Sequence, residues 1–129
     1  MLESAESGME ETLFSFNKQK DLYTEITKET FNQVWNFERE WKQNSTDTIK
    51  RINYNTQGKY AEFLRKLSED SQVIESYYNS FESVGGISPS AWTFLLMSKY
   101  YKIEDIRIRL VIAINYLTLN DYAERNEKY

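Results

Sequence analysis

The segment from Pro89 to Leu119 constrains the fold most, because it carries two apolar stripes on opposite sides of one predicted helix. On a wheel of about 100° per residue, the first stripe fills an arc of roughly 100°. Its members are Trp92, Leu95, Leu96, Ile103, Ile106, Leu110, Ala113, Ile114 and Leu117. The members of the opposite stripe are Phe94, Met97, Tyr101, Ile108, Ile112 and Leu119. Such a helix must lie between other helices or bury one stripe in a second protein.

Two earlier segments also show apolar residues at helical spacing, so the sequence predicts three helices. They cover about 9–43, 46–83 and 89–120, and a frayed segment at 1–8 precedes them. Val84-Gly85-Gly86-Ile87 predicts the end of the second helix, and Ser88-Pro89 predicts the start of the third.

The polar run at 44–47 has two interpretations. It is either a turn, with Ser45 or Thr46 as a new helix cap, or part of one long helix. The second interpretation rests on the eleven-residue spacing of Trp41, Ile52, Phe63 and Ile74, which is close to the pitch of a straight helix. We favour the turn because it buries more aromatic surface.

Residues 106–116 also alternate between apolar and polar positions, so a strand competes with a helix there. No other segment offers a partner strand, and a lone strand leaves its backbone groups unpaired. The sequence therefore predicts a single all-α domain over 1–129. The expected architecture is an elongated three-helix bundle or a long helical hairpin with coiled-coil character.

The composition excludes several kinds of chemistry. The chain has no histidine and no cysteine, so Cys/His zinc sites, thiol nucleophiles and histidine-dependent triads are impossible. Paired carboxylates such as Glu104-Asp105 are adjacent on a helix and point about 100° apart, so they form no metal site by themselves. We expect no catalytic, cofactor or metal site, and a protein that is not an enzyme.

The N-terminal stretch has no basic region and no apolar run, so the sequence predicts neither a signal peptide nor a transmembrane segment. We therefore expect a cytoplasmic protein. The net charge of −4 gives no general attraction for nucleic acid.

Aromatic and apolar residues outside the expected core predict a protein-protein interface, because Trp and Tyr bury much area at little entropic cost. The candidate interface combines one flank of the first helix with the second stripe of the third. Its residues are Phe31, Trp35, Phe94, Met97, Tyr101, Ile108, Ile112 and Leu119. A homo-oligomer formed through residues 89–119 is the simplest version, and a partner protein is the other.

Two alternatives remain. The basic section from Lys50 to Lys66 places Arg51, Lys59 and Lys66 on one face of the predicted helix, where they could follow a phosphate backbone as part of a nucleic-acid-associated regulator. Long amphipathic helices can also coat a hydrophobic particle or lipid surface.

Overall fold

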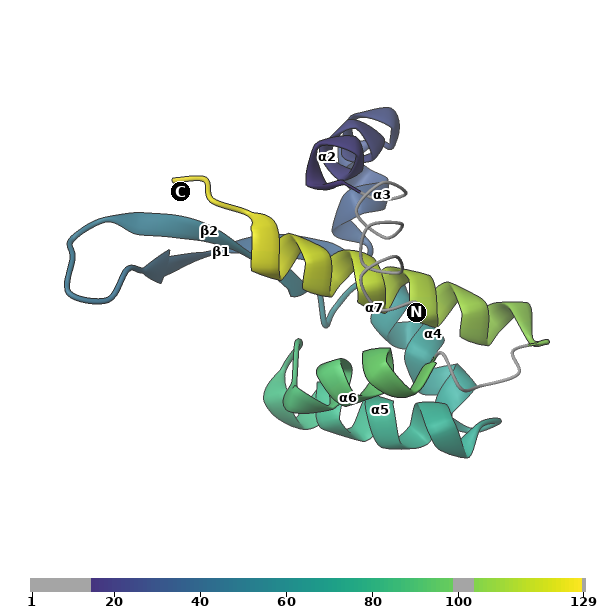
Figure 1. The fold of residues 1–129 in the computed structure, drawn as a ribbon. Helices are drawn as coiled ribbons and strands as arrows, with labels where there is room; N and C mark the ends of the chain where they lie inside the picture. The colour runs from purple at the N-terminus through teal and green to yellow at the C-terminus, as the bar shows by residue number, and fades with distance from the viewer. Residues whose placement is uncertain (1–14, 99–103, 129) are drawn as a thin grey trace, which may run out of the picture.

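The computed structural model describes residues 15–98 and 104–128, and within them the chain forms helices together with one two-stranded sheet. The elements are α2 (Phe16–Glu25), α3 (Lys28–Asn32), β1 (Trp35–Trp41), β2 (Thr48–Tyr54), α4 (Lys59–Ser68), α5 (Gln72–Val84), α6 (Pro89–Ser98) and α7 (Ile106–Glu124). Helix α7 crosses the molecule above α4, α5 and α6, and the β1–β2 hairpin projects from this helical body (Figure 1). The predicted all-α three-helix bundle or coiled-coil hairpin is therefore wrong.

The hairpin replaces the end of the first predicted helix and the start of the second. Strands β1 and β2 pair antiparallel from Trp35 opposite Tyr54 to Trp41 opposite Thr48. Tryptophan, phenylalanine, threonine and isoleucine favour strands, and here tertiary pairing prevails over the helical spacing. Asn44 in the loop has a φ of 59°, which also rules out one continuous helix through 44–47.

The second predicted helix is further divided into α4 and α5. Ser71 caps α5, since its hydroxyl accepts a hydrogen bond from the Ile74 amide at 3.4 Å. Gly58 is not inside a helix but caps α4, where a Cβ would lie 2.4 Å from the Gln33 carbonyl oxygen. The predicted stop is confirmed: Gly85 ends α5 with a φ of 83°, and its amide bonds to the Phe81 carbonyl.

The third predicted helix is two helices in the structure. Pro89 begins α6 as predicted, and residues 106–116 are helical rather than a strand. Asp105 starts α7 by accepting a hydrogen bond from the Arg107 amide at 2.9 Å. The predictions for 1–8, for a helix start near residue 9 and for Tyr101 lie outside the described residues.

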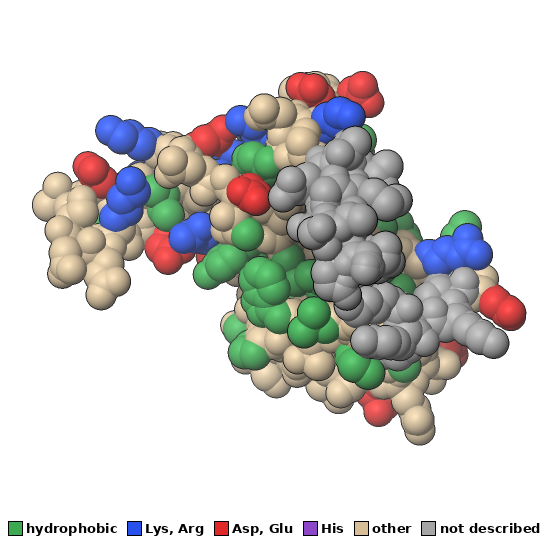
Figure 2. All heavy atoms as spheres, in the orientation of Figure 1, with side chains coloured by type: hydrophobic (Ala, Val, Ile, Leu, Met, Phe, Trp, Pro, Cys, Tyr) green, Lys and Arg blue, Asp and Glu red, His purple; other side chains and the backbone are tan. Residues whose placement is uncertain are grey.

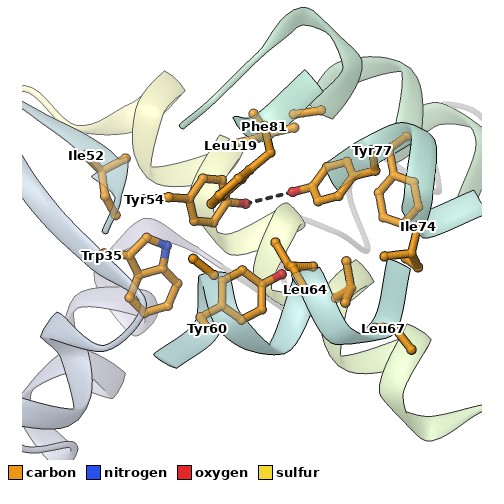
Figure 3. Packing of buried hydrophobic residues seen from close by; sticks show 14 residues of the cluster. Trp35, Ile52, Tyr54, Tyr60, Leu64, Leu67, Ile74, Tyr77, Phe81 and Leu119 are labelled. Atoms are coloured by element: carbon orange, nitrogen blue, oxygen red, sulfur yellow. Dashed lines mark hydrogen bonds between the residues drawn. The ribbon is translucent and has the colours of Figure 1, made fainter. Parts of the chain in front are cut away.

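The core lies where α4, α5, α6 and α7 meet the base of the hairpin, as Figure 3 shows. Leu64, Ile74 and Val111 are completely buried there. A polar chain crosses this apolar centre: the hydroxyls of Tyr54 and Tyr77 are 3.1 Å apart, and Tyr77 donates to Asn115 Oδ1 at 2.9 Å. Asn115 in turn donates to the Ala91 carbonyl at 3.1 Å, which joins α7 to α6.

Candidate interaction surfaces

The structure does not gather the predicted interface residues on one exposed face. Trp35, Phe94 and Leu119 belong to the core, with exposed fractions of 5%, 6% and 2%. Phe31, Ile108 and Ile112 are partly buried against that core. Among the described members of the predicted interface, Met97 alone is classed as exposed, at 44%.

The buried members of this set have structural roles. The Trp35 indole donates to the Thr118 hydroxyl at 2.7 Å, which fastens β1 to α7. Phe94 packs on Tyr77 with ring centroids 4.7 Å apart, which fastens α6 to α5. Substitutions at Trp35 or Phe94 would therefore report on folding before they reported on association.

The exposed apolar surface comes instead from the first stripe of the 89–119 segment. Trp92, Leu96, Ile106 and Leu110 have exposed fractions of 42%, 63%, 74% and 47%. We call these four residues together with Met97 the α6–α7 face. A helical wheel showed both stripes but could not tell which would meet α4 and α5, because the two are equally apolar.

The α6 part of the α6–α7 face lies in an uncharged stretch of the chain, whereas Ile106 and Leu110 on α7 lie beside Arg107 and Arg109. No charged residue occurs between Glu82 and Lys99, so α6 carries no charge at all. Helices α6 and α7 pack against each other. Figure 2 shows hydrophobic side chains at the surface between α6 and the C-terminal half of α7. The surface matches the aromatic and aliphatic composition of interface centres, which are depleted in charge.

The residues predicted to contact nucleic acid are also separated. Arg51 lies on β2, where its Nε is 2.6 Å from Glu40 Oε2 and its guanidinium lies 4.7 Å from the Tyr122 ring centroid. Lys59 and Lys66 lie on α4, and Lys66 Nζ is 3.5 Å from Glu62 Oε1. They do not share one helix face with Arg51, so the predicted phosphate-tracking face does not form.

The hairpin carries a basic and aromatic face that the helical prediction missed. Arg39 on β1 stands directly opposite Lys50 on β2, so both side chains leave the same side of the sheet. Trp41 is on that side too, because strand residues two apart share a face, and 64% of it is exposed. The placement of Phe37, Arg39 and Trp41 at alternate positions is the sequence pattern that could have predicted this face.

Three tyrosines of the core are buried and have raised pKa values. Burial raises the pKa of Tyr54 to about 12, and it raises the pKa values of Tyr60 and Tyr77 well above the usual value near 10. These hydroxyls stay protonated at neutral pH, which suits hydrogen bonding rather than acid-base chemistry. Within residues 15–98 and 104–128, no three acidic side chains come together as a metal site would require.

In the described part of the chain, no helix has the length and apolar character needed to cross a bilayer. No protein-family model matches the sequence, and neither a curated protein nor a solved structure matches it.

Proposed function

We propose that this protein is a non-enzymatic, cytoplasmic interaction module that self-associates through the α6–α7 face. The observation that carries the proposal is the exposure of Trp92, Leu96, Met97, Ile106 and Leu110 on two consecutive helices. Burying one such side chain completely contributes roughly 1.5–3 kcal/mol. A symmetric contact would bury each of them on both subunits.

The absence of charge favours a second copy of the chain as the occupant. In a two-fold interface the residues nearest the axis lie close to their own copies, so a charged residue there meets a like charge. The segment between Glu82 and Lys99 has no such residue and can approach itself without repulsion. An acidic or basic partner would find no complementary charge on α6.

Leu96→Asp and Ile106→Asp test the proposal. Both side chains are mostly exposed in the monomer, so we expect the helical circular dichroism and the thermal midpoint to change little. We expect the wild-type protein at about 100 µM to have at least twice the monomer mass by light scattering after gel filtration, and each variant to be a monomer.

Trp41→Asp is the matched control, because Trp41 is 64% exposed and Leu96 is 63% exposed. It removes an exposed apolar side chain from the hairpin rather than from the α6–α7 face, so the oligomer should persist. A wild-type protein that is monomeric at every concentration would contradict self-association. So would a Trp41→Asp variant that dissociates as completely as Leu96→Asp.

Binding of the hairpin to duplex DNA is a second candidate, favoured by the Arg39 and Lys50 arrangement. Like charges directly opposite in a sheet are unfavourable, and a phosphate backbone would offset their repulsion. A two-stranded ribbon fits the major groove, and this hairpin projects from the body (Figure 1).

Charge reversal at Lys50 tests this candidate by fluorescence anisotropy with a labelled 20-base-pair duplex. We expect Lys50→Glu to weaken binding about tenfold at 50 mM salt and to reduce the slope of log affinity against log salt by about 1. Lys66→Glu, on α4, should bind as the wild type does. Absence of binding at 50 mM salt, or equal loss in both variants, would exclude the hairpin as a DNA contact.

A further inference from the structure

A groove of about 460 Å³ opens between α2, α3, β1 and the segment after α7. Its apolar wall is formed by Tyr23, Ile26, Phe31 and Phe37. Phe31 stacks on Phe37 with ring centroids 5.4 Å apart, and Tyr23 meets Phe31 edge-on at 5.1 Å. These contacts hold the aromatic wall in place, and the volume is within the usual range for small-molecule sites.

The charged residues that line the groove are all cationic: Lys20, Lys28 and Arg125. Arg125 is fixed beneath the aromatic wall, with its guanidinium 4.4 Å from the Phe37 ring centroid. Its Nε and Nη2 donate to the two carboxylate oxygens of Asp121 at 2.8 and 2.9 Å, and its Nη1 donates to Glu127.

Charge balance leaves one cation in excess at this groove. Arg125 pairs with Asp121 and Glu127, and Lys20 Nζ is 3.5 Å from Glu127 Oε2. Three positive charges therefore face two negative ones. Within the described residues Lys28 makes no ion pair, and the residues that line the groove include no acidic side chain.

We propose that the groove binds a small anionic amphiphile whose carboxylate lies at Lys28 and whose apolar body lies along Ile26 and Phe31. The apolar wall would bury the hydrocarbon body of the ligand, and the surplus positive charge would pair with its carboxylate. A nucleobase suits the groove less well, because Phe31, Lys50 and Arg125 already cover the Phe37 ring. The site shares no residue with the α6–α7 face, so it is independent of the proposed self-association.

Octanoate and 1-octanol are matched probes, because they share the eight-carbon chain and differ in charge. We expect calorimetric titration of the full chain to show that octanoate binds about tenfold more tightly than 1-octanol. Backbone amide shifts on adding octanoate should concentrate at residues 20–37 and near Arg125.

Lys28→Glu should weaken octanoate binding about tenfold and leave 1-octanol binding unchanged. The substitution places an acidic residue at the start of α3, where the helix dipole favours it, so the fold should be retained. Lys59→Glu, at the start of α4 and away from the groove, is the control that should bind octanoate normally.

Three results would overturn the proposal. The first is absence of octanoate binding at 5 mM. The second is equal affinity for octanoate and 1-octanol, which would mean that charge contributes nothing. The third is a set of amide shifts centred on the α6–α7 face, which would place the amphiphile elsewhere.

Discussion

Tyr60 differs from the other tyrosines of the core in its hydrogen bonding. Its hydroxyl is buried and has no partner within the described residues, whereas Tyr54 and Tyr77 bond to each other and onward to Asn115. The Tyr60 ring itself is well used, since it stacks on Tyr54 with centroids 5.7 Å apart. The ring therefore stabilises the core. Burial of the hydroxyl costs free energy, because no hydrogen bond compensates for its lost contact with water.

Tyr60→Phe should leave the free energy of unfolding at pH 7 unchanged or raise it by about 1 kcal/mol, because it removes an unpaired buried hydroxyl and keeps the ring. Tyr77→Phe is the contrasting variant. It leaves Asn115 without its donor and should lower the free energy of unfolding by about 1–3 kcal/mol. Urea unfolding measures both, and a Tyr60→Phe variant as unstable as Tyr77→Phe would contradict this expectation.

Tyr60→Phe should also change how the free energy of unfolding depends on pH above pH 10. Burial raises the pKa of folded Tyr60 well above its unfolded value near 10. Its contribution to stability is therefore constant below pH 10 and is lost as the pH rises toward the folded pKa. Between pH 10 and 11, Tyr60→Phe should lose less stability than the wild type, by about 1 kcal/mol, because the unfolded tyrosine ionises in this range while the folded one stays protonated. The free energy of unfolding can be measured by urea titration at each pH. If it falls equally with pH in both proteins, Tyr60 ionises freely in the folded state.

At the scale of the elements, the apolar residues of the β1 segment fit both a helical and a strand spacing. Val34, Phe37 and Trp41 fit a helix, and Trp35, Phe37 and Trp41 fit a strand equally well. Pairing decides between them, because β2 supplies Ile52 and Tyr54 to the same buried face as Trp35. Ile52 and Tyr54 lie 17 and 19 residues after Trp35, so the local pattern around β1 could not reveal them.

The boundaries that depend on local chemistry were predictable. Gly85 ends α5 because a left-handed residue is required there, and Pro89 begins α6 because its fixed φ suits a first helical turn. Periodicity also revealed both apolar stripes of the 89–119 segment. It could not assign them to core or surface, because that choice depends on where α4 and α5 pack. The interface prediction therefore named Phe94 and Leu119, which are buried, and left out Leu96 and Ile106, which are exposed.

At the scale of the whole molecule, three separate surfaces have different chemistry. The α6–α7 face is apolar and lies beside an uncharged segment, the hairpin face is basic and aromatic, and the groove beside α2 joins an aromatic wall to a surplus cation. The first two surfaces come from elements that are consecutive in the sequence, whereas long-range packing creates the groove. The groove in particular unites Phe37 with Arg125, residues far apart in the sequence, which explains why no local motif indicated it.

The contacts between α2 and α7 also have a consequence for the order of folding. Gln19 donates to the Leu117 carbonyl and Tyr23 to Asp121, and both bonds join residues 98 positions apart. Closing a loop of that length costs about 4 kcal/mol of chain entropy, far more than closing the short β1–β2 loop. We therefore expect the hairpin to form early and α2 to dock last. In native-state hydrogen exchange, α2 amides should open at a lower free energy than those of α5, and uniform protection would show that the molecule opens only as a whole.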